Sequence, residues 1–392
     1  MSPDRNHPAN ADGYAILADR VFDGHHWHPE AVVLIRDGRI AGLGSRRDVP
    51  VGWPQTRLQP GAFLVPGFID LQVNGGGGIL LNDQPTADGM RAIARAHRRY
   101  GTTGCLPTLI TDAREQMRSA IAAARSIGGR NGILGLHLEG PFISPQRPGV
   151  HRPDRIVKPE AGDLEELRDL AGAGRSLVTL APECVPAGFI RSLSAGGVRV
   201  AIGHSEASAQ VVIQAVADGA TGVTHLFNAM PPLSARAPGI IGAALAEHRL
   251  TAGLIVDGIH VDPVSVRAAF AAKSPDRIAL VTDAMPTVGT SLDYFELLGR
   301  RIKLAGGRLT TDEGTLAGAH LDMASAVRNA VGLAQIPLED ALRAASLTPA
   351  RFLSLDKERG ALFAGARADL VALTQDLKVV ATWCGGSTDD GD

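Results

Sequence analysis

Four side chains that can bind a metal ion or move a proton stand at the ends of short apolar runs. Glu139 ends the run 133–139, and His204, His225 and Asp283 lie at or near the ends of three later runs. A carboxylate at the end of a buried strand is costly to desolvate unless a cation or hydrogen bonds satisfy it. Imidazole and carboxylate are ordinary zinc ligands, and a catalytic zinc site keeps one position open for water. We therefore predict a metal site of Glu139, His204 and His225.

Such a site has the components needed to hydrolyse an amide. A divalent cation lowers the pKa of bound water towards about 7 and supplies a nucleophile at neutral pH. Asp283 is a candidate general base for that water, and it can later return the proton to a leaving amine. Taken singly, each histidine is more often a structural residue, and Glu139 could pair with an arginine. The prediction rests on the four side chains together.

The elements that must bring these side chains together alternate between strand and helix. Helical periodicity occurs at 88–100, 113–127, 162–171, 186–195, 206–218 and 263–272. Apolar runs typical of buried strands lie at 68–74, 103–109, 133–139, 176–183, 199–205, 222–228, 252–260 and 278–283. Eight alternating units favour an α/β fold of the TIM type, a (β/α)8 barrel, in which all strand ends meet at one face. A doubly wound sheet is the alternative, but the four glycines at 75–78 lack its GxGxxG context.

Both ends of the chain have a different pattern. Short β-like runs occur at 14–18, 31–35 and 39–43, and Asp-Gly pairs between them indicate tight turns. Two helical segments, 322–333 and 338–345, follow the last barrel run. Further strands are then predicted at 359–363, 368–373 and 379–383. We expect a small β-sandwich domain formed by both termini, with parts 13–65 and 359–386, around a catalytic barrel of 66–358; residues 1–12 are predicted to be a disordered tail.

Composition narrows the classes of function. The 392 residues are 45% hydrophobic and 20% charged, with a formal net charge of -2. No basic block is present, which argues against nucleic acid or an anionic membrane as a partner. Three cysteines without CxxC spacing indicate reduced thiols. The polar residues 1–12 lack the apolar core of a signal peptide, and no apolar run is long enough for a membrane span. We therefore expect a soluble cytoplasmic protein.

Six motifs, in their order, resemble those of the N-acetylglucosamine-6-phosphate deacetylase family of the amidohydrolase superfamily. They are PGFID at 66–70, HLEGP at 137–141, GHS at 203–205, THLFNAM at 224–230, DGIH at 257–260 and VTDA at 281–284. The similarity extends from Tyr14 to about Trp383. It implies a β/α barrel with a small β-sandwich built from both termini. It also implies metal-dependent hydrolysis of the acetamide of N-acetyl-D-glucosamine 6-phosphate to D-glucosamine 6-phosphate and acetate, in amino-sugar catabolism.

The resemblance also implies roles for individual residues. Glu139, His204 and His225 would bind the metal, and Asp283 would act first as base and then as acid. His151 would polarise the acetamide carbonyl. The 6-phosphate would be held by Arg236 and His260, commonly across the interface of a homodimer. Further contacts to this small-molecule sugar phosphate are implied for Asn228, Ala229, Ala317, Gly318 and Ala319.

The number of metal ions is predicted from a difference between this sequence and a common amidohydrolase motif. Many amidohydrolases have His-x-His after strand 1, but here the chain reads Gln72-Val73-Asn74. Neutral amides are weaker zinc ligands than imidazole, so we predict one divalent ion, Zn²⁺ in the first place, with Fe²⁺, Co²⁺ or Mn²⁺ as alternatives. His137 is expected to pack or support the site, and no role is assigned to Met285 or His320.

Three other functions stay open at this point. The first is a deacetylase for N-acetylgalactosamine 6-phosphate, and the second is another amidohydrolase such as a deaminase. The third is a non-catalytic barrel that acts as a sugar-phosphate-sensing scaffold. A sensor would be free to lose its ligands, whereas the predicted ligand set and Asp283 are intact.

Overall fold

The computed structural model describes residues 13–388, and its largest sheet holds eight parallel strands. Strands adjacent in the sheet are also consecutive along the chain. They are β8 (Phe68–Val73), β11 (Thr102–Ile110), β12 (His137–Glu139), β13 (Leu177–Leu180), β14 (Arg199–Ile202), β15 (Gly222–Val223), β16 (Thr251–Leu254) and β17 (Ile278–Leu280). All eight predicted strands are therefore present, in the predicted order.

Contacts between the first and last strands close this sheet. Val73 forms a parallel bridge with Ala284. The backbone N–H of Asp283 donates to the carbonyl of Gln72 (2.9 Å), and that of Asn74 donates to Ala284 (3.0 Å). A closed sheet of eight parallel strands with helices outside it is a TIM-type barrel, so the predicted fold class is confirmed.

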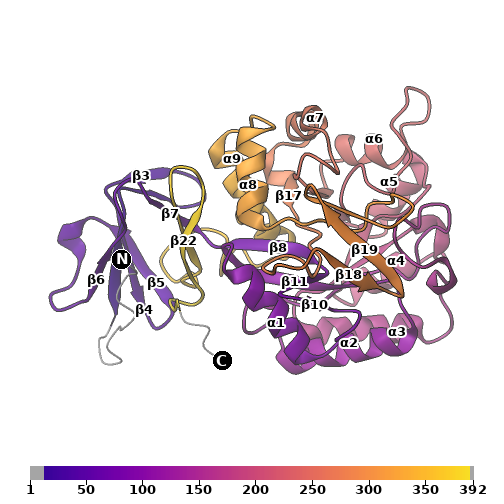
Figure 1. Cartoon of the computed structure of the whole chain (residues 1–392), viewed down its shortest axis with the longest axis horizontal. Coiled ribbons are helices and arrows are strands. Elements are labelled where there is room, and N and C mark those ends of the chain that lie inside the picture. Colours follow the sequence, from indigo (N-terminus) through magenta and orange to yellow (C-terminus); the bar gives the residue numbers. More distant parts are fainter. Residues whose placement is uncertain (1–12, 389–392) are drawn as a thin grey trace.

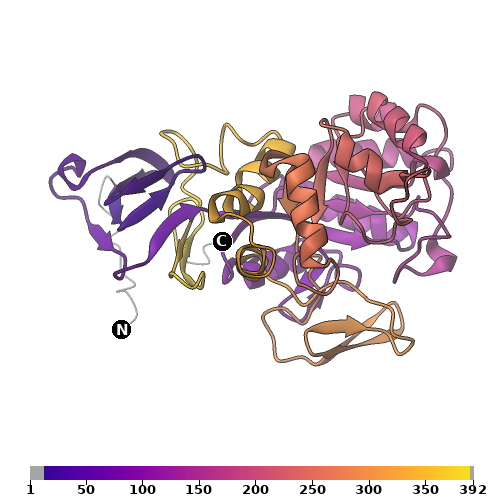
Figure 2. The same ribbon diagram turned by 90° about the horizontal axis from the view of Figure 1, so that it is seen from above.

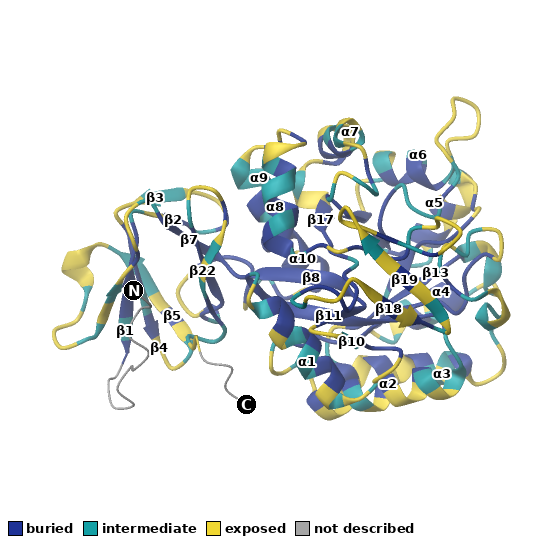
Figure 3. Cartoon of the chain, in the orientation of Figure 1, coloured by how far each residue is buried: buried dark blue, intermediate teal, exposed yellow. Residues whose placement is uncertain are grey.

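Amphipathic helices cover the outside of the barrel. They are α1 (Ala87–Arg98), α2 (Arg114–Ile127), α3 (Asp163–Arg168), α4 (Phe189–Ala195), α5 (Ala209–Ala217), α6 (Gly239–Ala246), α7 (Pro263–Lys273), α8 (Met323–Gly332), α9 (Leu338–Ala345) and α10 (Leu347–Phe352). In α2, buried residues recur three or four positions apart, at Met117, Ala120, Ile121, Ala124 and Ile127. Figure 3 shows the result: buried strands inside and exposed outer faces on the helices. Within residues 13–388 no helix has the length and apolar character needed to cross a bilayer.

Strands from both ends of the chain form two smaller sheets beside the barrel (Figure 1). One has the order β5-β4-β1-β6 and the other β22-β21-β7-β2-β3, so late strands pair with an early one. Their residues, including Ile16, Val33, Leu64, Leu370 and Trp383, share one apolar core. The strands are β1 (Tyr14–Leu17), β2 (Arg20–Phe22), β3 (Trp27–Pro29), β4 (Val32–Arg36), β5 (Arg39–Gly44), β6 (Gln55–Arg57), β7 (Phe63–Pro66), β21 (Leu370–Leu373) and β22 (Val379–Trp383).

The domain boundaries at 13–65, 66–358 and 359–386 stay a prediction, and the tail 1–12 lies outside the described residues. The strand predicted at 359–363 is wrong. That segment bends instead, and Gly360 has a φ of 87°. The backbone N–H of Leu362 in this segment donates to the carbonyl of Asp23 in the early part of the chain (2.7 Å).

Several barrel strands end earlier than predicted. The runs 222–228 and 252–260 contain strands only to Val223 and Leu254. After β15 the backbone enters the left-handed region at His225 (φ 29°) and Phe227 (φ 81°), which no strand can accommodate. Leu226 is fully buried in this loop. Hydrophobicity alone therefore made the loop resemble a continued strand.

A three-stranded antiparallel flap follows β17 and was not predicted. It consists of β18 (Tyr294–Leu297), β19 (Arg300–Ala305) and β20 (Arg308–Thr310). In Figure 2 the flap projects from the barrel as the orange strands at the lower right. Beneath it lies a separate apolar cluster that includes Phe295 and Ile302 from the flap and Leu80 and Met285 from the barrel side. Leu80 belongs to β10 (Ile79–Leu80), which pairs with β9 (Gly75–Gly76).

One tryptophan joins the small sheets to the barrel. The ring of Trp27 lies 5.1 Å from Phe22 and 5.4 Å from Phe63 between centroids. Its Nε1–H donates to Glu339 Oε1 on α9 at 2.7 Å. Apolar contact and one hydrogen bond to a charged acceptor therefore act at the same place.

We predict that this hydrogen bond stabilises the junction. Glu339→Ala and Glu339→Gln both remove the negative charge from the first turn of α9, but only Gln keeps an acceptor oxygen. Glu339→Ala should therefore lower the free energy of unfolding by about 1 kcal/mol relative to Glu339→Gln. Urea unfolding followed by tryptophan fluorescence measures this difference. Equal stability of the two variants would contradict the prediction.

Candidate metal centre

Glu139, His204 and His225 converge at the carboxyl ends of β12, β14 and β15. Glu139 Oε1 lies 2.9 Å from His225 Nε2 and 3.2 Å from His204 Nε2. The two Nε2 atoms are 3.0 Å apart, and all three side chains are buried. Two imidazole nitrogens that face each other beside a carboxylate oxygen form a donor set that suits a divalent transition metal.

Hydrogen bonds and backbone geometry orient these donors. His204 Nδ1 lies 2.8 Å from the carbonyl of Arg147, so Nδ1–H donates there and Nε2 offers its lone pair. His225 Nδ1 is buried without a hydrogen-bond partner among the described residues. The φ angles of His204 (47°), His225 (29°) and Asp283 (51°) are in the left-handed region. Non-glycine residues held there are strained, and such strain is concentrated at functional sites.

The charge of Glu139 is stabilised by the two imidazoles. Burial by itself raises the pKa of a carboxyl group. Hydrogen bonds and positive charge from His204 and His225 nevertheless hold the pKa of Glu139 well below its usual value. In turn, Glu139 raises the pKa of His225, against the effect of burial, which lowers it.

Asp283 lies beside this cluster and is connected to it by two amides. Gln72 Nε2 is 3.1 Å from both carboxylate oxygens of Glu139 and 3.1 Å from Asp283 Oδ1. Asn74 Nδ2 donates to the same Asp283 oxygen at 2.6 Å. Burial, and then the charge of Glu139, raise the pKa of Asp283 to about 6. The amides at the His-x-His positions therefore act as donors to two carboxylates.

A further buried carboxylate, that of Asp70, supports Asp283. It was not singled out from the sequence. Asp70 accepts hydrogen bonds from the hydroxyl (2.5 Å) and backbone N–H (3.2 Å) of Thr282, and from the N–H of Gln72 (3.1 Å). Burial raises its pKa to about 7. These bonds join the residue before Asp283 to β8. An aspartate inside a strand that is apolar apart from Gln72 was the available signal.

His151 lies against the cluster from the loop after β12. Its ring centroid is 4.4 Å from that of His204, and a ligand atom from each of Glu139, His151 and His204 lies within 4.8 Å of the others. Burial, and then the charge of His204, lower the pKa of His151 to about 3, so the ring is neutral at physiological pH. A neutral imidazole has one N–H group and one nitrogen lone pair, so the tautomer determines whether His151 Nε2 donates or accepts a hydrogen bond.

Thr111, another residue missed from sequence, controls that tautomer. His151 Nδ1 is 2.7 Å from Thr111 Oγ1, and the Thr111 hydroxyl donates to the carbonyl of Glu139 at 3.2 Å, so that Nδ1–H of His151 donates to Thr111 in this arrangement. A donor role for His151 Nε2 requires the Thr111 hydroxyl to give its hydrogen to Nδ1. Gly140 makes room for this contact, because a Cβ there would lie 2.1 Å from Thr111 Oγ1; its φ of 86° also favours glycine.

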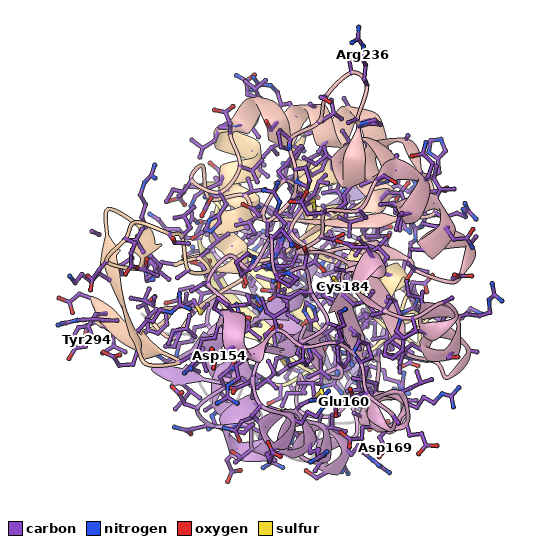
Figure 4. All side chains as sticks on the ribbon, turned by 90° about the vertical axis from the view of Figure 1, so that its right-hand side faces the viewer. Asp154, Glu160, Asp169, Cys184, Arg236 and Tyr294 are labelled. Carbon is purple, nitrogen blue, oxygen red and sulfur yellow. The ribbon has the colours of Figure 1, made fainter. Side chains whose placement is uncertain are left out.

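The two predicted phosphate ligands lie in different surroundings. His260 Nδ1 is 2.6 Å from Asp257 Oδ2, and both side chains are largely buried. Although burial raises it, the hydrogen bond and charge of His260 hold the pKa of Asp257 below its usual value. His260 follows the carboxyl end of β16 (Thr251–Leu254), the same end of the barrel as the centre. By contrast, Figure 4 shows Arg236 at the tip of a projecting loop, pointing away from the barrel. Within one chain, Arg236 therefore points away from the other predicted site residues on the barrel.

The remaining predicted contacts lie on two segments beside the centre. Asn228 Nδ2 turns back to the carbonyl of His225 (3.2 Å), and Ala229 has a φ of 51°. Ala319 pairs with Ala284, and its N–H donates to the carbonyl of Asp283 at 2.9 Å. This brings the segment 317–319 next to Asp283.

The three residues without firm roles have structural contacts. His137 is buried between Thr179 Oγ1 (2.7 Å) and Thr108 Oγ1 (3.3 Å), and burial lowers its pKa to about 4. Met285 belongs to the apolar cluster below the flap. His320 Nδ1 lies 2.9 Å from Thr287 Oγ1.

Comparison with known proteins shows close relatives over almost the whole length. N-acetylgalactosamine-6-phosphate deacetylase from Shewanella sp. (strain ANA-3) is 39% identical, over 98% of this chain and 97% of the relative. N-acetylglucosamine-6-phosphate deacetylase from Haemophilus influenzae is 34% identical, over 95% and 98%.

A solved structure and a family profile agree with these relatives. The crystal structure of N-acetylglucosamine-6-phosphate deacetylase from Pasteurella multocida superposes with a TM-score of 0.92, at 34% identity, over 96% of this chain and 100% of that one. The sequence profile of the amidohydrolase family matches residues 63–388. The chain belongs to the amidohydrolase family.

Proposed function

We propose that this protein is a metal-dependent deacetylase that hydrolyses N-acetyl-D-glucosamine 6-phosphate to D-glucosamine 6-phosphate and acetate, in amino-sugar catabolism. The observation that carries the proposal is the convergence of Glu139, His204 and His225 next to the buried Asp283. The activities named for the Haemophilus and Pasteurella relatives support the choice of substrate. Three free cysteines support a cytoplasmic location.

The residues of the centre divide the chemistry between them. Glu139, His204 and His225 would hold one divalent ion, Zn²⁺ in the first place, and the same donors accept Fe²⁺, Co²⁺ or Mn²⁺. Such an ion supplies Lewis-acid activation of water and of the acetamide carbonyl. Asp283 accepts a proton from the attacking water and delivers it to the amide nitrogen. The C–N bond then breaks, the amine leaves, and the acetyl group is released as acetate.

Other side chains would position the substrate. His151 would present a hydrogen on Nε2 to the carbonyl oxygen as negative charge develops there, and this requires the Thr111 hydroxyl to donate to His151 Nδ1 instead of to the carbonyl of Glu139. Asn228, Ala229 and the segment 317–319 would contact the sugar. We infer that His260 binds the 6-phosphate, with its ring fixed by Asp257.

We further propose a single metal ion. Gln72 Nε2 lies between the carboxylates of Glu139 and Asp283, where its two N–H groups reduce their mutual repulsion. Amide nitrogens donate hydrogen bonds but do not ligate cations as imidazole does. Gln72 and Asn74 would thus support Asp283 without a second ion.

Arg236 is proposed to act on a partner chain in a homodimer. Its exposed position at the tip of a projecting loop (Figure 4) is the reason. A guanidinium matches the geometry of a phosphate and suits the 6-phosphate of a substrate bound in the neighbouring chain.

The epimeric substrate is a second candidate. The Shewanella relative, an N-acetylgalactosamine-6-phosphate deacetylase, has 39% identity, compared with 34% for the Haemophilus relative. The two sugars differ only in the orientation of one hydroxyl group. The acetamide chemistry and the phosphate contacts would be the same for both.

We predict acetate release from N-acetylglucosamine 6-phosphate that depends on one metal ion per chain. A chelator should abolish turnover, and one equivalent of Zn²⁺ should restore it. Enzymatic assay of acetate and elemental analysis of the same sample measure both quantities. Faster turnover of the galactosamine epimer would favour the second candidate. Metal-replete protein that releases no acetate from either sugar would point to a sensor or another amidohydrolase.

Asp283 must be ionised to accept a proton, and this gives a pH dependence. Its pKa is raised to about 6, and a cation bound by neighbouring Glu139 would lower it. The rate should therefore be constant above this value and fall as the pH decreases through about 6 or below. Asp283→Asn should lower kcat by at least about 10²-fold at neutral pH while the metal content is retained. Asp88→Asn on α1 is the matched control. Near-normal turnover of Asp283→Asn would refute the assignment of the base.

Mixing two defective variants tests the role of Arg236. Asp283→Asn and Arg236→Ala should each be weakly active alone, the latter through a raised KM. After subunit exchange, half of the dimers are hybrids, and each hybrid has one intact site. The mixture should therefore recover about one quarter of the wild-type activity. A rate equal to the average of the two parents would show that Arg236 does not complete a partner's site.

A further inference from the structure

A polar cavity lies at the end of the barrel opposite the candidate metal centre, where the strands begin. It has a volume of about 360 Å³ and is lined by residues at the starts of β14 to β17 and by α10. Four of these residues are arginines: Arg199, Arg249, Arg277 and Arg351. Arg199 opens β14, and His204 follows the other end of the same strand. At the rise of an extended strand, the five residue steps from Arg199 to His204 span about 16 Å. The cavity is therefore separate from the candidate metal centre.

The charges around this cavity do not balance. Asp276 pairs with Arg351 at 2.8 Å, and Glu247 makes two short contacts to Arg249, at 2.9 and 2.7 Å. These two carboxylates neutralise two guanidinium groups. Within residues 13–388, Arg199 and Arg277 have no carboxylate partner. The whole chain has a net charge of -2, so this local excess of positive charge does not follow from the overall composition.

The surroundings of Arg199 favour an anion. Among residues 13–388 its guanidinium contacts are with neutral groups, the hydroxyl of Ser354 (2.5 Å) and the ring of Phe352, 5.5 Å from the centroid. Burial lowers the pKa of Arg199, and the charge of Arg175 lowers it further. An anion beside Arg199 would offset both effects.

Hydroxyl groups complete the lining. Thr221 and Thr251 lie at the starts of β15 and β16 and line the cavity with the arginines. Thr221 Oγ1 is buried and has no hydrogen-bond partner in the described part of the chain.

We propose that this cavity binds a small phosphate-bearing anion, with Arg199 and Arg277 as its main ligands. Guanidinium forks match phosphate oxygens in pairs, and threonine hydroxyls can donate to the remaining oxygens. The volume is at the lower end of the range for small-molecule sites, which suits inorganic phosphate or a small phosphate monoester. This site does not depend on the proposed deacetylase function.

Calorimetric titration of the full chain with inorganic phosphate at constant ionic strength tests the proposal. The cavity variant is Arg199→Gln/Arg277→Gln. The control is Arg168→Gln/Arg308→Gln, which removes the same charge from two exposed arginines that form no ion pair among the described residues. Wild type and control should bind one phosphate per chain more than the cavity variant, and acetate release should be unchanged in all three. Identical titrations of the cavity variant and the control would overturn the proposal.

Two additions make the result decisive. If the double variant does not fold, Arg277→Gln alone, at an exposed position, should still weaken phosphate binding at least tenfold. No weakening in that folded variant would overturn the proposal. Glucose 6-phosphate as a second titrant distinguishes the source of the phosphate group: tighter binding than inorganic phosphate in the control, lost in the cavity variant, identifies a monoester site. Equal affinity of both ligands identifies a site for free phosphate.

Discussion

Two buried carboxylates, Glu139 and Asp283, stand side by side at one end of the barrel, and the site is arranged so that both can carry charge. Two imidazoles stabilise the first, and the amides of Gln72 and Asn74 stabilise the second. Gln72 contacts both carboxylates through one nitrogen. Without these donors, the repulsion between two negative charges in a desolvated site would force one of the two carboxylates to bind a proton. The proposed site with one metal ion and a free base depends on this balance.

Barrel closure is what assembles this arrangement. Gln72 and Asn74 belong to the first strand region, and Asp283 follows the last strand, so they meet only when the sheet closes. Asp70 strengthens the same junction through Thr282, one residue before Asp283. The hydrogen bonds that complete the fold therefore also position the candidate base. A change at Asp70 would disturb the geometry of Asp283 without touching the substrate.

Sequence patterns predicted the eight strands well, because strands buried on both faces are continuous apolar runs. The same signal failed at 222–228, where buried Leu226 lies in a left-handed loop whose geometry leaves no trace in hydrophobicity. The candidate ligands could be named because imidazole and carboxylate have distinctive chemistry at strand ends. Thr111, Asp70 and the bridging contacts of Gln72 could not, because their roles depend on distances between strands. The proposed role of Arg236 depends on a partner chain rather than on the fold of one chain.

The five-stranded sheet beside the barrel has a consequence for synthesis on the ribosome. β7, which leads directly into the first barrel strand, pairs with β21 from near the end of the chain. Until β21 has left the ribosome, β7 has an open edge of apolar residues, Phe63 to Pro66. Such edges recruit strands from other chains. The newly made protein must therefore keep this edge covered or apart from other chains until its last strands arrive, although the barrel itself is already complete in sequence.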